Sequence, residues 1–356
     1  EALLYEAYHP LGTTAVITAA NYPVLLWAWS AVTAAVCGNS IIWKPSPRAL
    51  RSALAVQQLA ARTAAAAGAP EGLFSLISDS DGTLARRMAE DTRIPLVSFT
   101  GSPASGREIG GRVGARMGRS LLELGGSNAA VITPGADLPA AVEACFTSAI
   151  LTAGQRCTSL RRLIVHESLH ERVLAALQDK YDGLVVGNPF AEATTCGPLQ
   201  GKPAADRFRA GLKTAAAQDA LLIAGGHFLA AEHAGSPWYA HPALLDTPPA
   251  APLLREEWFA PLLFVLPYRG TLEKAIRLID DAPCGLVASL FSHDPAEAEL
   301  FLSAAGPRVG MAHVNLGTAG ADLALPFGGE KASGHGRVSG SDSWKHFMRQ
   351  TAGGMG

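Results

Sequence analysis

A single cysteine in a turn of small residues is the strongest candidate for chemistry in this sequence. Cys157 lies in the stretch TAGQRCTSLRR, which runs from Thr152 to Arg162, and Arg156 directly precedes it. A cysteine attacks carbon as its thiolate, and an adjacent guanidinium favours that form if it points toward the sulfur. A lone cysteine is also often a small buried residue with no reactivity, so this alternative stays open on these residues alone.

Three polar side chains elsewhere follow segments typical of buried strands. Asn21 follows the β-branched run TTAVIT, Lys44 follows SIIW, and Ser102 follows IPLVSF. In open α/β sheets, ligands bind at the carboxyl ends of the strands, and helix N-termini attract phosphate through their free N–H groups. We therefore expect Asn21, Lys44 and Ser102 to lie on one ligand-binding edge.

Helical segments alternate with these strands. The apolar run from Pro23 to Val36 predicts a helix that Gly38 ends, residues 48–67 predict a second, and a third begins at Pro103. Strand, helix, strand and helix in this order predict an α/β fold with a Rossmann-like, doubly wound parallel sheet.

A second α/β unit is expected after the sequence LELGG, in which Glu123 precedes two glycines that allow close backbone approach. We place the boundary near Gly125. The predicted parts of the chain are one domain at 1–124, a second at 125–325 and a C-terminal segment at 326–356. Further predicted elements are helices at 138–152 and 167–181, strands at 163–166, 262–266 and 310–315, and loops lining a cleft in the glycine-rich stretch 319–340.

The bulk properties exclude several classes of partner. The 356 residues carry 29 basic and 31 acidic side chains, a net charge of -2 with no long run of either sign, which argues against nucleic acid and anionic membrane surfaces. The apolar run 23–37 is too short to span a bilayer. Five cysteines without a CxxC pair predict free thiols in a reducing, cytoplasmic environment, and ten histidines without ligand spacing predict no metal site.

Several separated motifs together resemble the aldehyde dehydrogenase superfamily. They are the Asn after the first strand, WKP, ELGG, GQRC, EEWFAP at 256–261 and PFGGEKASGHGR at 326–337. The resemblance covers essentially the whole chain. It implies a nucleotide-binding domain at 1–124, a catalytic domain at 125–325 and a C-terminal return segment with an oligomerisation strand at 326–356. TAGQRCT, VGNP at 186–189 and GRVSGSDSWKHFMRQ at 336–350 look most like the antiquitin-type branch, which oxidises α-aminoadipic semialdehyde, in equilibrium with piperideine-6-carboxylate, in lysine breakdown.

The resemblance implies a role for each matching residue. Cys157 would attack the aldehyde to give a thiohemiacetal and then a thioester, Asn21 would hold the oxyanion, and Glu123 would activate water. The implied cofactor is NAD, with NADP less favoured, and the implied partner is a small-molecule aldehyde. The implied cofactor-binding residues are Thr18, Lys44, Pro45, Gly101, Ser102, Leu124, Gly125, Glu257 and Phe259. Those implied to face the substrate are Arg156, Thr158, Thr318, Gly320 and Ala321.

Two departures from the family pattern leave alternatives open. Pro47 stands where many members carry an acid that binds the ribose, so the residues do not decide between NAD and NADP. Full-length relatives also have a long stretch before the strand at Thr13, so we expect early elements and half of an oligomerising ribbon to be missing. The alternative function is a truncated, catalytically silent fold that binds nucleotide or partners. Acyl transfer to coenzyme A is disfavoured by Glu123, and a homo-oligomer is expected through the segment after Phe347.

Overall fold

The computed structural model describes residues 2–230, 235–320 and 322–356, and the chain divides into two compact units. Unit 1 comprises Glu1–Leu124, Asp322–Gly329 and Ser333–Gly356, and unit 2 comprises Gly125–Ala321 and Glu330–Ala332. The segment expected to form a separate return at 326–356 therefore belongs to unit 1, apart from three residues that belong to unit 2.

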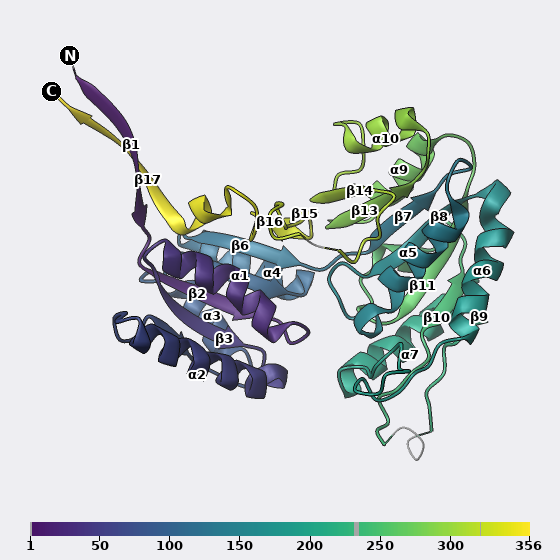
Figure 1. Ribbon diagram of the computed structural model, residues 1–356, viewed down its shortest axis with the longest axis horizontal. Helices are drawn as coiled ribbons and strands as arrows, with labels where there is room; N and C mark the ends of the chain where they lie inside the picture. The colour runs from purple at the N-terminus through teal and green to yellow at the C-terminus, as the bar shows by residue number, and fades with distance from the viewer. Residues whose placement is uncertain (1, 231–234, 321) are drawn as a thin grey trace. The chain divides into compact units, whose positions relative to one another are not determined.

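Unit 1 is built on a six-stranded sheet (Figure 1). Its strand order is β16-β6-β5-β2-β3-β4, and every neighbouring pair is parallel except β16 with β6. The strands are β2 (Thr13–Thr18), β3 (Ser40–Pro45), β4 (Phe74–Leu76), β5 (Leu96–Gly101), β6 (Arg119–Leu124) and β16 (Gly334–His335). The helices are α1 (Pro23–Val36), α2 (Leu50–Ala66), α3 (Thr83–Glu90) and α4 (Pro103–Ala115), with a 3-10 turn η1 (Pro47–Ala49) before α2.

Both faces of this sheet are covered, as a doubly wound fold requires. On one face Trp27 of α1 packs with Trp43 of β3 and with Phe347, a residue from the end of the chain. On the other face Ile109 of α4 packs with Phe99 of β5. The continuous apolar strands seen in the sequence are buried on both sides because helices lie on both sides. The predicted α/β fold is thus confirmed for this unit.

Unit 2 contains a seven-stranded sheet in the order β14-β13-β7-β8-β11-β10-β9. Only β9 runs antiparallel to its neighbour. Its strands are β7 (Asn128–Ile132), β8 (Leu160–His166), β9 (Leu221–Ala224), β10 (Ala243–Asp246), β11 (Leu262–Tyr268), β13 (Val287–Phe291) and β14 (Met311–Val314). Its helical elements are α5 (Leu138–Ile150), η2 (Leu151–Gly154), η3 (Glu167–Leu169), α6 (His170–Asp182), α7 (Lys202–Ala216), η4 (Pro252–Arg255), α9 (Leu272–Asp280) and α10 (Pro295–Leu302).

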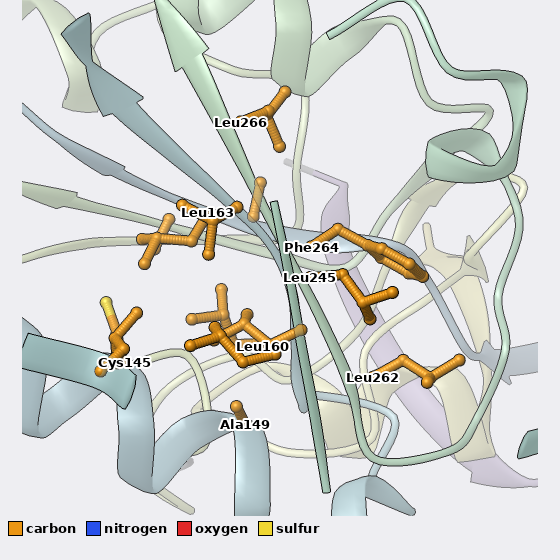
Figure 2. Packing of buried hydrophobic residues seen from close by; sticks show 14 of the residues in the cluster. Cys145, Ala149, Leu160, Leu163, Leu245, Leu262, Phe264 and Leu266 are labelled. Carbon is orange, nitrogen blue, oxygen red and sulfur yellow. The ribbon is translucent and has the colours of Figure 1, made fainter. Parts of the chain in front are cut away.

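The core of unit 2 lies between its helices and the central strands β8 and β11. Figure 2 shows Cys145 and Ala149 of α5 near Leu160 and Leu163 of β8, and Phe264 of β11 on the same sheet. All five are buried, and the burial of such apolar side chains is the main favourable contribution to the stability of the unit. Within the described ranges, no helix is long and apolar enough to cross a membrane.

The chain carries a β-ribbon whose first strand the sequence did not predict. β1 (Leu3–Pro10) pairs antiparallel along its whole length with β17 (Met348–Met355), which follows the short turn η5 (Ser343–Phe347). The pair projects from the six-stranded sheet of unit 1 (Figure 1). The strand was missed because LLYEAYHP has side chains exposed on both faces, so it lacks the alternation that marks a half-buried strand.

The glycine-rich stretch expected to form only loops contains two short strands. β15 (Glu330–Lys331) pairs with β12 (Cys284–Gly285) in unit 2, and β16 pairs with β6 in unit 1. Gly334 adopts φ +108°, and a Cβ there would lie 1.9 Å from the carbonyl oxygen of Leu122. Glycine is therefore required for this pairing, so a composition typical of loops here serves a strand.

Candidate active site

Cys157 lies on a strained loop between α5 and β8. Thr152, Ala153 and Gly154 have consecutive positive φ values of 57°, 50° and 64°, a conformation that costs free energy for residues other than glycine. A Cβ on Gly154 would lie 2.6 Å from the Cα of Pro261, so the loop packs directly against that backbone. The thiol itself is half-buried. The loop thus presents Cys157 from a backbone that the surrounding structure holds in place.

Asn128 holds the same loop from the start of β7, and the sequence reading did not assign it. Its buried amide donates to the carbonyl oxygens of Cys157 at 2.6 Å and Ser159 at 2.9 Å. The Ser159 hydroxyl in turn accepts from the backbone N–H of Arg156 at 3.2 Å. An asparagine directly after LELGGS is the only sequence signal for this role, and it carries no chemistry of its own.

The residues expected to face the substrate lie together beside this loop. The Arg156 guanidinium donates to the carbonyl oxygen of Ala319 at 3.3 Å, and the Thr318 hydroxyl donates to that of Thr158 at 2.8 Å. Both threonines are buried, whereas Gly320 is exposed. Ala321, the last residue of this expected set, lies outside the described residues. The two threonines therefore join the loop at Thr318 to the nucleophile loop.

Glu257 and Phe259 belong to the segment that packs against the nucleophile loop. A Glu257 carboxylate oxygen accepts from the backbone N–H of Gly126 at 3.1 Å. A Cβ on Gly125 would lie 1.8 Å from the same oxygen, so a side chain at this position would displace the Glu257 carboxylate. Burial raises the pKa of Glu257 to about 7, although the nearby Arg161 and the Gly126 N–H favour its charged form.

Glu123 lies in unit 1, at the carboxyl end of β6. Both of its carboxylate oxygens are buried and accept no hydrogen bond from the described residues. Burial raises the pKa of Glu123 well above its usual value, and the charge of Arg337 opposes that effect. The Arg337 guanidinium is anchored on the carbonyl oxygens of Gly329 and Gly336. A buried carboxyl with a raised pKa is what a base working near neutral pH requires.

Lys44, near the end of β3, pairs with an acid that the sequence analysis did not single out. Its ammonium forms an ion pair with Asp79 at 2.9 Å, and both side chains are largely buried. Asp79 follows β4 and also accepts from the backbone N–H of Leu84 at 2.6 Å near the start of α3. Its pKa is lowered despite burial, because Lys44 and that N–H stabilise the carboxylate. The acidic turn SDSDG was the only sequence signal for this residue.

The remaining cofactor candidates of unit 1 end the other strands or flank them. Thr18 and Pro45 are neighbours in the β2–β3 register, and the Thr18 hydroxyl accepts from the Trp43 indole at 2.9 Å. Gly101 ends β5, and Ser102 is the N-cap of α4, where its hydroxyl accepts from the N–H of Ser105. The N-cap position places the free N–H groups of α4 at the expected edge.

Two further candidates complete this edge. Leu124 ends β6, and a Cβ on Gly106 of α4 would lie 2.3 Å from a Leu124 methyl group, so the helix packs closely on the strand. Asn21 is half-buried between β2 and α1.

The candidate residues thus form two groups, one in each unit. Unit 2 holds Cys157, Arg156, Thr158, Thr318, Gly320, Gly125, Glu257 and Phe259, and unit 1 holds Asn21, Glu123, Thr18, Lys44, Pro45, Gly101, Ser102 and Leu124. The pairing of Cys157 with Asn21 and Glu123 stays a prediction. Of the other cysteines, Cys37, Cys145 and Cys196 are buried free thiols. Across the described residues, no group of three or more His, Cys, Asp or Glu side chains could hold a metal ion.

Comparison with known proteins identifies the family that this chain resembles in sequence. The aldehyde dehydrogenase family model matches residues 1–352. A Pisum sativum protein named aldehyde dehydrogenase family 7 member A1 is 38% identical over 351 residues, which are 99% of this chain and 68% of that protein. The α-aminoadipic semialdehyde dehydrogenase of Mus musculus is 36% identical over 349 residues, which are 98% of this chain and 64% of that protein.

Solved structures agree with the sequence relatives. Betaine aldehyde dehydrogenase from Staphylococcus aureus, solved in complex with NAD+, superposes with a TM-score of 0.93 at 26% identity and covers 99% of this chain and 69% of its own. An NAD-dependent aldehyde dehydrogenase from Sinorhizobium meliloti superposes with a TM-score of 0.92 at 26% identity, over 99% of this chain and 68% of its own. The chain belongs to the aldehyde dehydrogenase family.

Proposed function

We propose that this protein oxidises an aldehyde to a carboxylic acid through a covalent intermediate on Cys157. The observation that carries the proposal is the half-buried cysteine on a strained loop, which Asn128 and the contact of Gly154 with Pro261 fix in place. The thiolate adds to the aldehyde carbon and gives a thiohemiacetal, whose oxyanion the Asn21 amide and the Cys157 N–H would stabilise. Loss of hydride then leaves a thioester.

Glu123 is the proposed base for the second half of the reaction. Water must lose a proton as it attacks the thioester, and the buried Glu123 carboxylate, which accepts no hydrogen bond from the described residues, would take it up. The products are the carboxylic acid and the regenerated thiol. An enzyme that passes the acyl group to a thiol needs no such base, so the carboxyl supports hydrolysis over acyl transfer.

NAD is the proposed cofactor, and the carboxyl edge of the sheet in unit 1 fits a dinucleotide. Lys44, Thr18 and the N-cap Ser102 would hold its ribose and phosphate groups, and Glu257 and Phe259 of unit 2 would bind its nicotinamide end. When bound, NAD accepts the hydride. Asp79 supports NAD over NADP, because its carboxylate neutralises Lys44 and would repel a 2′-phosphate.

The best-supported substrate is α-aminoadipic semialdehyde, as in lysine catabolism. The mouse relative that bears this name matches 98% of the chain. Arg156 precedes the nucleophile and carries a positive charge that suits the carboxylate at the far end of this aldehyde. Its guanidinium is anchored on the carbonyl oxygen of Ala319, beside the loop at Thr318.

Self-association is proposed through the ribbon of β1 and β17. Leu3, Leu4, Tyr5 and Met355 expose between 50% and 79% of their surface on it. Within the described residues each of the two strands pairs only with the other, so each keeps an open edge. Exposed apolar side chains on an open edge support a homo-oligomer.

Rapid-mixing measurements of NADH formation test the proposed function. Wild type is expected to show a burst followed by steady turnover, Glu123→Gln a burst of one equivalent without turnover, and Cys157→Ala neither. The matched control is Cys37→Ala, which removes a buried thiol of unit 1 and should leave the burst intact. Full NADH production by Cys157→Ala would refute the proposal. NAD binding by wild type without any burst would instead support the catalytically silent fold.

A further inference from the structure

Two consecutive arginines on β8 are buried, which is unusual for such strongly hydrated charges. Arg161 is 1% exposed and Arg162 is 4% exposed. Successive side chains of a strand point to opposite faces of the sheet, so the two guanidinium groups contact different parts of unit 2. Burying a charge without partners is costly, and each group must therefore be compensated by what it contacts.

The buried guanidinium of Arg162 is compensated by hydrogen bonds to backbone carbonyl oxygens. Its guanidinium donates to the carbonyl oxygens of Ser127, Leu278 and Ile279 at distances between 2.6 and 3.1 Å, from all three of its nitrogens. The negative groups that act on it are Asp280, Asp281 and Cys284. Arg162 thus joins the residue before β7 to the end of α9, and its guanidinium donates no hydrogen bond to the described residues of the nucleophile loop.

Arg161 instead joins the nucleophile loop to the segment that carries Glu257. It donates to the Ala260 carbonyl oxygen at 2.7 Å and to the Arg156 carbonyl oxygen at 3.3 Å. Its guanidinium carbon lies 5.9 Å from the centre of the Phe259 ring. The Nε–H is buried and has no hydrogen-bond partner among the described residues. One of the guanidinium N–H groups of Arg161 therefore lacks a hydrogen-bond partner in the described part of the chain. Another donates to the carbonyl oxygen of Arg156, the residue directly before Cys157 in the chain.

The charges around Arg161 identify what compensates it. Burial lowers the pKa of Arg161 to about 10, which still leaves it cationic at neutral pH, and the groups that favour its charge are Glu257 and Cys157. The other charged groups of unit 2 in this region are Arg156 on the loop itself and Arg207 of α7, which acts on Glu257. Arg161 is thus a buried cation whose charge both Glu257 and Cys157 favour.

We propose that Arg161 is the positioning residue of the nucleophile: it holds the Cys157 loop against the segment at Ala260 and stabilises the Cys157 thiolate with its charge. This inference rests on the proposed function only in taking Cys157 as the reactive thiol. The strained loop fits this role, because three positive φ values persist only where neighbouring contacts over-determine them. Arg156, which the sequence made the first candidate for this charge effect, donates from its guanidinium to the carbonyl oxygen of Ala319.

Alkylation of Cys157 by iodoacetamide tests the inference without cofactor or aldehyde. The thiolate displaces iodide, so the pH midpoint of the alkylation rate reports how readily the thiol loses its proton. Peptide mass spectrometry follows Cys157 alone, and Cys157→Ser is the blank. A nearby opposite charge shifts such a midpoint by about one unit or more. Arg161→Gln is therefore expected to raise the midpoint by at least about one pH unit, and Arg161→Lys by less.

Arg162→Lys is the matched control, since it perturbs an equally buried arginine on the same strand. It should lower the thermal stability and leave the alkylation midpoint unchanged. A folded Arg161→Gln with the wild-type midpoint would overturn the inference. If that variant does not fold, Arg161→Met, which also removes the charge, takes its place, because a folded Arg161→Met with the wild-type midpoint would overturn the inference as well. Turnover by wild type plays no part in either outcome, so failure of the proposed function would be seen separately.

Discussion

Replacing Glu257 by glutamine should change how the stability of unit 2 depends on pH. The carboxyl is enclosed in the folded protein, where burial raises its pKa from 4.5 to about 7. Glutamine has nearly the same shape and keeps an oxygen that can accept from the Gly126 N–H, but it cannot ionise. The substitution therefore removes the titration with little change in packing.

The sign and size follow from proton linkage. Below pH 4.5 the carboxyl is protonated in both states and has no effect. Between 4.5 and 7 the unfolded chain releases the proton while the folded protein keeps it, so wild type loses stability as the pH rises. Over that window the loss reaches about 3 kcal/mol at most, since each pKa unit corresponds to about 1.4 kcal/mol. Above pH 7 both states are ionised and the loss stays constant.

Amide hydrogen exchange of β8 and β11 measures the stability of this unit by itself. The free energy of unfolding of Glu257→Gln minus that of wild type should rise by up to about 3 kcal/mol between pH 4.5 and 7.5. The control is Glu299→Gln, which removes an exposed carboxylate on α10 of the same unit. If the difference in free energy of unfolding between Glu257→Gln and wild type does not change with pH across this range, the raised pKa of Glu257 is refuted.

Asn39→Ala should destabilise unit 1 by about 3 kcal/mol, because the buried amide satisfies four backbone groups, the N–H groups of Leu11 and Gly12 and the carbonyl oxygens of Ala34 and Phe347. Urea titration measures it, and a loss below about 1 kcal/mol would show that water replaces those bonds. Light scattering should give wild type a multiple of the monomer mass and Leu4→Lys a lower one, and a monomeric wild type would contradict association through the ribbon.

The sequence predicted the elements that are apolar and bounded by strong breakers. The helix from Pro23 to Val36 and the strand at 13–18 were predicted with the observed bounds, because proline at the first helical position and an unbroken β-branched run mark them clearly. The helix expected at 48–67 was right in extent, although the structure begins it with a 3-10 turn at Pro47–Ala49. Local residue preferences determine these elements, so tertiary structure was not needed to find them.

Elements that owe their form to distant partners were missed. β1 is a strand only because β17, from the other end of the chain, pairs with it. β16 needs Gly334 to approach the Leu122 carbonyl, a demand that only the folded neighbour reveals. Asp79 and Arg161 were missed for the same reason, since their significance lies in Lys44 and in the carbonyl oxygens of Arg156 and Ala260.

The two-unit division carries a consequence for how the protein is made. Unit 1 takes its last strand of sheet and the buried side chain of Phe347 from the end of the chain, whereas unit 2 is almost entirely one continuous stretch. During synthesis from the N-terminus, unit 2 can complete most of its core while unit 1 still waits for residues that the ribosome has not released. The unit that begins first in the sequence is therefore expected to finish folding last. Until β16 is made, the sheet of unit 1 has an open edge at β6, and this is the stage of synthesis at which we expect the nascent chain to need a chaperone most.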